Sequence, residues 1–256
     1  MDSPAVHTVS EFYDSLAEDF DAMTGFENRF VQERPFFRLL THRFGITTAV
    51  DAGSGTGFHS LLLSQLGVKV TAVDASRKMI EVLRRHALER HLDIPSVVSD
   101  FEELPGKLHG EFDAVFVMGN TLAHLLSEEE VVTALEAFRK ILRPGGLLLL
   151  QNLNYDRILA SREKIQSIRE HGGTTFVRYY EYEAALIQFH ILKIQREPGS
   201  IQHELNTVAL RPIPKDEIVA LLARLGFREI KVHGGIALDE FRADSSRDLV
   251  VLALKG

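Results

Sequence analysis

Residues 49–60 read AVDAGSGTGFHS, and this stretch decides the fold. A short apolar run reaches Asp51 and is followed at once by Gly53, Gly55 and Gly57. Glycines at such a junction allow a tight turn with positive φ and let a ligand approach the backbone closely. Apolar residues after the glycines recur with the period of a helix. The pattern predicts a strand, a ligand-binding glycine loop and a helix.

The same alternation extends in both directions from this loop. Across residues 46–159 and 213–256, short apolar runs alternate with segments of helical period, which is typical of a parallel sheet covered by helices. Ser127 and Glu130 form a capping-box pattern at the start of one helix, and residues 143–146 (RPGG) are expected to separate that helix from the fifth strand. We expect an α/β fold with a Rossmann-like, doubly wound, mainly parallel seven-stranded sheet.

Between these two parts the apolar pattern changes to period two. Residues 174–183, 186–195 and 204–210 are predicted to be neighbouring strands with one face exposed to water. Pro198 and Gly199 supply the turn chemistry between the last two. We therefore expect a small antiparallel β insert over residues 160–212.

Composition excludes several classes of function. Among 256 residues, 29 Lys and Arg stand against 36 Asp and Glu, a net charge of −7, so we expect no nucleic-acid partner. The absence of Cys excludes disulfides, zinc-thiolate sites and a Cys nucleophile. No long apolar stretch or signal core occurs, so we expect no membrane partner and a cytoplasmic location. The His residues are scattered without metal-ligand spacing, and we expect no metal.

Asp74 ends the second predicted strand, 21 residues after Gly53, where a carboxylate can accept hydrogen bonds from a ribose diol. With the glycine loop, it indicates an adenosine-containing cofactor. A dinucleotide fingerprint needs G-x-G-x-x-G, whereas this loop reads G-x-G-x-G with Phe58 in the sixth position. An NAD(P)-dependent oxidoreductase and a non-catalytic cofactor-binding protein stay open as alternatives.

An ordered set of motifs carries a family resemblance. It comprises the glycine loop, Asp74, residues 99–101 (SDF), residues 112–120 (FDAVFVMGN) and residues 142–146 (LRPGG). With these motifs the sequence resembles the class I S-adenosylmethionine-dependent methyltransferases. The resemblance implies S-adenosyl-L-methionine as cofactor and S-adenosyl-L-homocysteine as product.

Two further motifs resemble the glycine and sarcosine N-methyltransferase branch of that family. They are GNTLAHL at residues 119–125 and NYDRIL at residues 154–159. Residues 12–21 (FYDSLAEDFD) resemble the N-terminal lid of the family. We interpret residues 1–256 as a single methyltransferase domain. Its parts are a helical lid (1–45), a cofactor-binding core (46–159), the β insert (160–212) and the C-terminal part of the core (213–256).

The resemblance also implies roles for individual residues in cofactor binding. Asp51 would hold the amino-acid end, Asp74 the ribose hydroxyls and Asp100 the adenine amino group. Arg29 and Arg34 precede the core, and either could meet the cofactor carboxylate or remain solvated. The implied cofactor-binding set is Asp51, Gly53, Ser54, Gly55, Gly57, Asp74, Ala75, Asp100, Phe101, Met118 and Gly119.

Three residues are candidates for catalysis. Asn120 and His124 follow the fourth strand at the edge where open α/β sheets bind ligands. Asn120 could position substrate or cofactor, and His124 could accept a proton or simply pack in the core. Tyr13 could close over the sulfonium with cation–π stabilisation, or anchor an amphipathic helix.

Acceptor binding is assigned to Tyr155, Arg178 and Arg211. Tyr155 belongs to the NYDRIL motif, and either arginine could grip a substrate carboxylate with two hydrogen bonds or lie as a solvated edge residue. We interpret the chain as a methyltransferase for a small-molecule acceptor, first of all an amine nitrogen, that acts by in-line displacement. Oxygen and carbon acceptors stay open, and the sequence does not indicate the oligomeric state.

Overall fold

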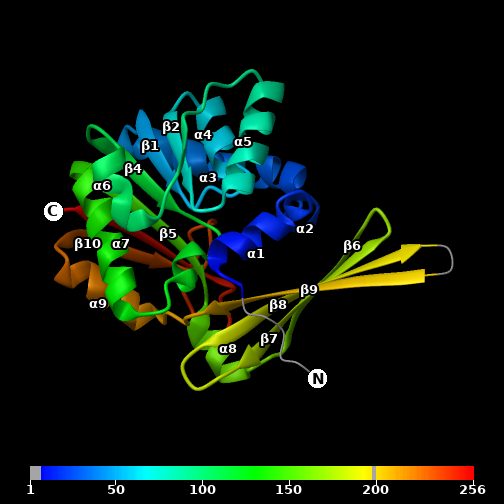
Figure 1. Cartoon of the computed structure of the whole chain (residues 1–256). Helices are drawn as coiled ribbons and strands as arrows, with labels where there is room; N and C mark the ends of the chain where they lie inside the picture. Colours follow the sequence, from blue (N-terminus) through cyan, green and yellow to red (C-terminus); the bar gives the residue numbers. More distant parts are fainter. Residues whose placement is uncertain (1–6, 198–199) are drawn as a thin grey trace.

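The computed structural model of the chain describes residues 7–197 and 200–256 (Figure 1). Residues 1–6 of the expected lid and the turn expected at Pro198 and Gly199 lie outside the described residues. The strands of the larger of two sheets are β1 (Thr48–Ala52), β2 (Lys69–Asp74), β3 (Ser96–Val98), β4 (Phe112–Val117), β5 (Leu142–Leu153), β10 (Phe227–His233) and β11 (Asp248–Lys255).

The large sheet has the order β10-β11-β5-β4-β1-β2-β3. β11 runs antiparallel to both β5 and β10, whereas the other pairs are parallel. The direction in which strands are added reverses between β1 and β4, and open sheets of this kind bind ligands beyond the carboxyl ends of the strands at such a point. The predicted seven-stranded, mainly parallel sheet is confirmed.

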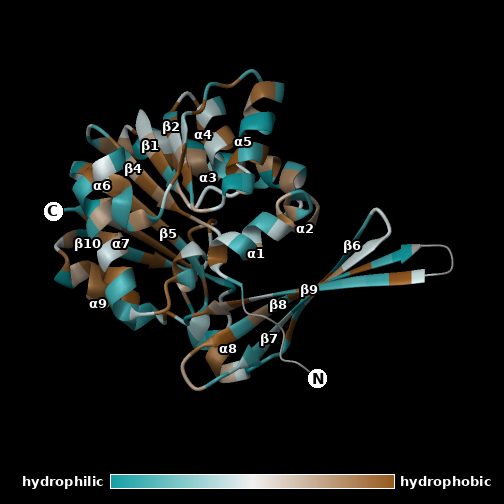
Figure 2. Cartoon of the chain, in the orientation of Figure 1, coloured by the Kyte–Doolittle hydropathy of each residue, from teal (hydrophilic) through white to brown (hydrophobic). Residues whose placement is uncertain are grey.

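Helices cover both faces of this sheet. α3, α4 and α5 pack on one face, and α6, α7 and α9 pack on the other. Figure 2 shows hydrophobic central strands and hydrophilic residues on the outer sides of the helices. Among the described residues, no helix is both long and apolar enough to cross a bilayer. The helices are α1 (Val9–Leu16), α2 (Phe20–Thr24), α3 (Phe26–Phe44), α4 (Phe58–Gln65), α5 (Arg77–Glu89), η1 (Phe101–Glu103), α6 (Leu104–Lys107), η2 (Thr121–His124), α7 (Glu128–Ile141), α8 (Tyr155–Ser161) and α9 (Lys215–Arg224).

The transition from α7 to β5 differs from the prediction. The capping box of Ser127 and Glu130 starts α7 as expected. However, α7 ends at Ile141 and β5 begins at the next residue, so residues 143–146 lie inside the strand. Leu142 pairs with Phe112 of β4, and a register shift after this pair absorbs the Pro-Gly-Gly segment. Pairing with β4 thus continues through a sequence whose local chemistry favours a break.

The smaller sheet is antiparallel, as predicted, but has four strands where the sequence indicated three. Its order is β6-β7-β8-β9, and β6 is the strand that the sequence pattern missed. Apolar residues in β6 do not alternate, because Ile165 and Ile168 are three residues apart and both are exposed. The strands are β6 (Ile165–His171), β7 (Thr174–Tyr182), β8 (Ile187–Glu197) and β9 (Ser200–Leu210).

One face of the small sheet packs against the N-terminal helices. Phe176, Ile191 and Val208 form a buried cluster with Phe12 and Met23. Figure 1 shows α1 between α5 and the strands β8 and β9. The small sheet therefore closes one side of the region beyond the carboxyl ends of the large sheet.

Asp113 lies at the opposite end of the strands of the large sheet, where β1, β4 and β5 begin. Its Oδ2 accepts hydrogen bonds from the backbone N–H groups of Thr47 and Thr48, over 2.8 and 3.0 Å, and its Oδ1 accepts one from Arg143 Nε over 2.6 Å. Burial alone would raise the pKa of Asp113, but the hydrogen bonds from Arg143 and the two threonines outweigh it and hold the pKa well below the usual range. One carboxylate thus joins the starts of β1, β4 and β5.

We predict that Asp113→Asn lowers the free energy of unfolding at pH 7 by about 2 kcal/mol, because charge-assisted hydrogen bonds are lost. A depressed carboxyl pKa stabilises the fold above the unfolded value of about 4, and this contribution disappears as pH falls. The difference between wild type and variant should therefore narrow from pH 5 toward pH 2. Urea unfolding across this pH range measures it, and a constant difference would contradict the assignment.

Candidate functional site

The glycine loop lies beyond β1, and its three glycines have positive φ: +78° at Gly53, +54° at Gly55 and +93° at Gly57. A Cβ atom at Gly53 would lie 2.4 Å from Cγ2 of Thr121, and one at Gly57 would lie 2.6 Å from Cγ of Leu83. Both φ and space therefore require glycine at these two positions. The predicted turn is a junction on which η2 and α5 both pack.

Two carboxylates flank this loop. Asp74 accepts hydrogen bonds from the backbone N–H of Gly55 over 2.8 Å and of Ser76 over 2.9 Å. Burial raises the pKa of Asp74 to about 6, against the opposing effect of these two bonds. Asp51 is fully buried, and Ser60 Oγ donates to its Oδ2 over 2.6 Å. Its Oδ1 has no partner among the described residues, and burial raises the pKa of this group as well.

The end of β4 forms a second polar edge. Gly119 N donates to Gln151 Oε1 over 2.7 Å, and Asn120 adopts a left-handed φ of +68°. The Asn120 side chain donates to the Tyr155 hydroxyl over 2.9 Å and accepts from the backbone N–H of Leu153 over 3.0 Å. The predicted residues Asn120 and Tyr155 are thus in contact, and both belong to the polar edge.

Tyr13 and His124 meet across 111 residues of sequence. The Tyr13 hydroxyl lies 2.8 Å from His124 Nε2, and their rings pack edge to face. Burial raises the pKa of the Tyr13 hydroxyl and lowers the pKa of His124 to about 4. Both groups are therefore neutral near pH 7, and His124 Nδ1 is buried without a partner in the described structure.

The two predicted acceptor arginines have different surroundings. Arg178 lies on the inner face of the small sheet near Tyr13, and its Nη2 donates to the Met23 carbonyl over 3.3 Å. Burial and the neighbouring Arg169 lower its pKa. By contrast, Arg211 forms an ion pair with Glu217, with 2.5 Å between Nη2 and Oε1. Of the two, Arg178 is the one without a carboxylate partner among the described residues.

Four other predicted residues lie farther from these contacts or at the protein surface. The Asp100 side chain is exposed, and the Phe101 ring turns toward Phe138 of α7, with 5.1 Å between centroids. Arg29 lies on the Phe58 ring beside the glycine loop, whereas Arg34 contacts Gln65 on the far side of α4. Arg29 is therefore the arginine near the loop.

Three further members of the predicted cofactor set are Met118, Ala75 and Ser54. Met118 is buried, and its carbonyl accepts from the Thr121 hydroxyl over 2.5 Å. The Ala75 carbonyl accepts from Ser10 Oγ over 3.4 Å. Ser54 is buried, and its hydroxyl has no partner among the described residues. The three residues follow the carboxyl ends of β4, β2 and β1.

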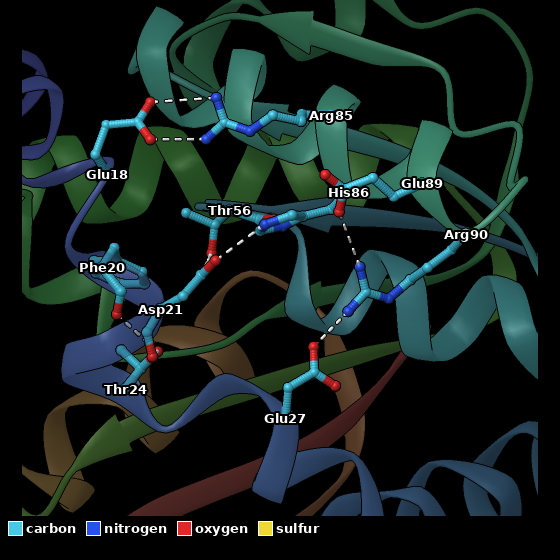
Figure 3. A network of polar contacts seen from close by, with 10 residues as sticks. All are labelled: Glu18, Phe20, Asp21, Thr24, Glu27, Thr56, Arg85, His86, Glu89 and Arg90. Atoms are coloured by element: carbon cyan, nitrogen blue, oxygen red, sulfur yellow. Dashed lines mark hydrogen bonds and ion pairs between the residues drawn. The ribbon is translucent and has the colours of Figure 1, made fainter. Parts of the chain in front are cut away.

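The N-terminal helices are fastened to the glycine loop by residues that the sequence analysis missed (Figure 3). Asp21 of α2 accepts from the Thr56 hydroxyl over 2.6 Å and lies 3.1 Å from His86 Nε2, while His86 Nδ1 lies 3.0 Å from the Thr56 carbonyl. The Asp21 carboxylate raises the pKa of His86. Glu18 pairs with Arg85 of α5, and Glu27 pairs with Arg90, the residue that follows α5. These contacts join segments distant in sequence, which local patterns do not reveal.

The unpartnered polar atoms test whether the site fits a polar adenosine cofactor. Asp51 Oδ1, the Ser54 hydroxyl and His124 Nδ1 are buried around the glycine loop without hydrogen-bond partners among the described residues. Native structures rarely leave such atoms unsatisfied, so they fit a polar ligand. In the described part of the chain, no group of three or more metal-ligating side chains lies together.

Comparisons with known proteins agree with this geometry. A family profile described as "Methyltransferase domain" matches residues 49–146. The glycine/sarcosine N-methyltransferase of Aphanothece halophytica is 30% identical over 229 residues, which are 89% of this chain and 84% of that protein. The corresponding enzyme of Halorhodospira halochloris is 28% identical over 89% of this chain and 83% of its own length.

Solved structures share the fold. An S-adenosylmethionine-dependent methyltransferase from Clostridium acetobutylicum superimposes with a TM-score of 0.80 over 95% of this chain and 99% of that one, at 13% identity. The similarity to the Aphanothece protein, at 30% identity over most of both chains, is the finding that shows the family. The chain belongs to the class I S-adenosylmethionine-dependent methyltransferases, for which S-adenosylmethionine is the methyl donor.

Proposed function

We propose that this enzyme transfers a methyl group from S-adenosylmethionine to the amine nitrogen of a small molecule. When bound, the donor supplies an electrophilic methyl group on a sulfonium. The family assignment sets aside the NAD(P)-dependent oxidoreductase and the non-catalytic binding protein.

For the donor, we propose that the glycine loop receives the methionine part. The free Oδ1 of Asp51 accepts from its amino group, and Arg29 faces its carboxylate. Asp74 binds the ribose hydroxyls in addition to its bond from Gly55 N. Asp100 lies at the exposed end of β3, where it can meet the adenine amino group. Carboxylates and backbone groups suit a neutral nucleoside with a zwitterionic tail.

For the acceptor, the observation that carries the proposal is the 2.8 Å contact between the Tyr13 hydroxyl and His124 Nε2. It lies beyond the carboxyl end of β4, beside the glycine loop and near Asp74. We propose that the hydroxyl donates to His124 and uses its oxygen to accept an N–H of the amine. This fixes the direction of the amine lone pair, and alignment of this kind supplies much of the barrier reduction in a displacement.

The magnitude of one pKa argues against His124 as the group that deprotonates the acceptor. An amino group has a pKa of about 8 to 10, whereas burial lowers the pKa of His124 to about 4. Moving the proton to His124 is therefore uphill by roughly 5 to 8 kcal/mol. We propose that the acceptor binds as its neutral amine and that His124 holds Tyr13 in place.

Arg178 supports an acceptor that also carries a carboxylate. The guanidinium lies near Tyr13 and Tyr180 with Arg169 beside it, and no carboxylate is among the groups that shift its pKa. A half-buried cation of this kind is stabilised by an anion from outside the chain. The curated relatives from Aphanothece and Halorhodospira are named for glycine and sarcosine, which have an amine and a carboxylate.

A matched acceptor panel tests the function directly. Glycine, sarcosine, glycolate and ethanolamine are incubated with methyl-labelled donor, and products are identified by mass spectrometry. We expect N-methyl products from the amines, faster turnover of glycine or sarcosine than of ethanolamine, and none from glycolate. Arg178→Gln should raise KM for glycine far more than for ethanolamine. Methylation of glycolate but not glycine would overturn the nitrogen assignment.

Asp74→Asn should weaken S-adenosylhomocysteine binding at pH 8 by about tenfold or more, because hydrogen bonds to a charged group are lost. The raised pKa of about 6 also sets a pH dependence, since only the ionised carboxylate accepts fully from the ribose. Wild-type affinity should fall as pH drops from 7 to 5. The variant should lack this dependence, and the exposed Asp93→Asn serves as control. Isothermal titration that gives equal pH profiles for wild type and Asp74→Asn would refute the assignment.

Tyr13→Phe should lower kcat about tenfold and leave the affinity for S-adenosylhomocysteine within twofold, because the hydroxyl acts on the acceptor. Tyr179→Phe, on the outer face of the small sheet, is the matched control. For wild type, kcat/KM should rise with pH between 7 and 9 as the free amine loses its proton. The same rise in His124→Asn would support the holding role, and its loss would identify His124 as the base.

A further inference from the structure

Glu33 is a buried carboxylate for which the proposed reaction has no use. It is 8% exposed, although it lies on α3 outside the glycine loop. Its Oε1 accepts a hydrogen bond from Arg29 Nε over 2.7 Å, and its Oε2 lies 3.1 Å from His59 Nε2. His59 is likewise buried, at 7% exposure. Burial of a carboxylate is unfavourable without such partners, so Glu33 and His59 depend on each other.

His59 stands next to Ser60, the residue that binds Asp51 beneath the glycine loop. Ser60, the next residue of α4, donates to Asp51 Oδ2, which leaves Oδ1 as the free oxygen. Burial raises the pKa of Asp51, and the His59 ring is near enough to oppose that rise. The first turn of α4 therefore holds one carboxylate on each side of His59. One belongs to α3 and the other to the end of β1.

The same turn places Arg29. The Phe58 ring lies 4.0 Å from Arg29 Cζ, and Glu33 holds the guanidinium through its Nε. The two groups proposed for the amino-acid end of the donor, Arg29 and Asp51, thus meet at the first turn of α4, where His59 binds Glu33 and the next residue, Ser60, binds Asp51. Groups that contact a ligand bind it well only when their own partners fix their rotamers.

We propose that Glu33 and His59 are positioning residues that set Arg29 and Asp51 for the amino-acid part of the donor. Neither touches the adenosine part. The inference rests on the proposed placement of the donor's amino group at Asp51. It predicts a selective effect: loss of either residue should weaken ligands that carry the amino acid and spare those that lack it.

Two compounds separate this effect from a general loss of structure. S-adenosylhomocysteine contains adenosine, sulfur and the amino acid, whereas 5′-deoxy-5′-methylthioadenosine keeps the adenosine and sulfur and has only a methyl group in place of the amino acid. Isothermal titration with both compounds gives one ratio for each variant: the dissociation constant of methylthioadenosine divided by that of S-adenosylhomocysteine. A structural defect would change both constants together.

We expect Glu33→Gln and His59→Gln each to weaken S-adenosylhomocysteine about tenfold and to change methylthioadenosine binding by less than twofold. The control is His190→Gln in the small sheet, because His190 is also buried and lies 3.4 Å from a glutamate, Glu181. Its ratio should equal that of wild type. Retained methylthioadenosine binding also shows that each variant is folded. If His59→Gln fails to fold, the isosteric Glu33→Gln alone decides.

Asp51→Asn separates failure of this inference from failure of the proposed donor placement. If Asp51→Asn leaves the ratio unchanged, the placement itself is wrong. If Asp51→Asn reduces the ratio but Glu33→Gln and His59→Gln do not, the positioning role alone is overturned. The positioning role is also overturned if Glu33→Gln and His59→Gln weaken the binding of both compounds equally. In the Asp51→Asn background, His59→Gln should weaken S-adenosylhomocysteine less than it does in wild type, because both substitutions act on the binding of the same part of the ligand.

Discussion

The structure depends on the missing Cβ atoms of Gly53 and Gly57. Their absence allows Thr121 of η2 and Leu83 of α5 to lie in the space that any side chain would fill. The backbone N–H of Gly53 also donates to the carbonyl of Val73 at the end of β2. A single loop therefore sets the spacing of β1, β2, the segment after β4 and α5. Asp51, Asp74 and His124 lie on these elements, so the relative positions of these three residues follow from the same steric constraint.

Burial keeps several ionisable side chains of the candidate site in their neutral form. The hydroxyls of Tyr13, Tyr155 and Tyr180 all have raised pKa values because burial disfavours the phenolate. They remain hydrogen-bonding groups without charge around a region that would receive a sulfonium and an amine. Asp74 lies beside the glycine loop, and Arg178 lies on the small sheet. The arrangement separates Asp74 from Arg178 and leaves neutral hydroxyls around the proposed acceptor site.

The sequence predicts the elements whose chemistry is local. The spacing of glycines and of Asp74 is set by one strand-turn-helix unit and the next strand, so both the loop and the carboxylate beside it are recognisable without a structure. β6 was missed because its Ile165 and Ile168 do not alternate. The strand forms through pairing with β7, which contributes to stability independently of its own pattern.

Contacts between distant segments escaped prediction for a related reason. In the sequence, His59 is one of several scattered histidines and no motif includes Glu33; only the packing of α3 on α4 brings the two together. The sequence likewise did not indicate that the Phe101 ring packs on Phe138, although the resemblance had implied Phe101 beside Asp100 in the cofactor set. Neighbours in sequence at the end of a strand point in different directions. The direction of each side chain is settled by tertiary packing.

The fastening of α2 to the glycine loop has a kinetic consequence. Phe20 lies over Gly55, where an added Cβ would be 3.7 Å from its ring, and Asp21 binds Thr56 in the same loop. With the donor placed at the loop as proposed, exchange of product for fresh donor is coupled to separation of α2 from the loop. The pairs Glu18 with Arg85 and Glu27 with Arg90 are partly solvent-exposed, so dissolved ions screen them. Ionic strength thus acts on residence time, and turnover that is limited by product release becomes sensitive to salt.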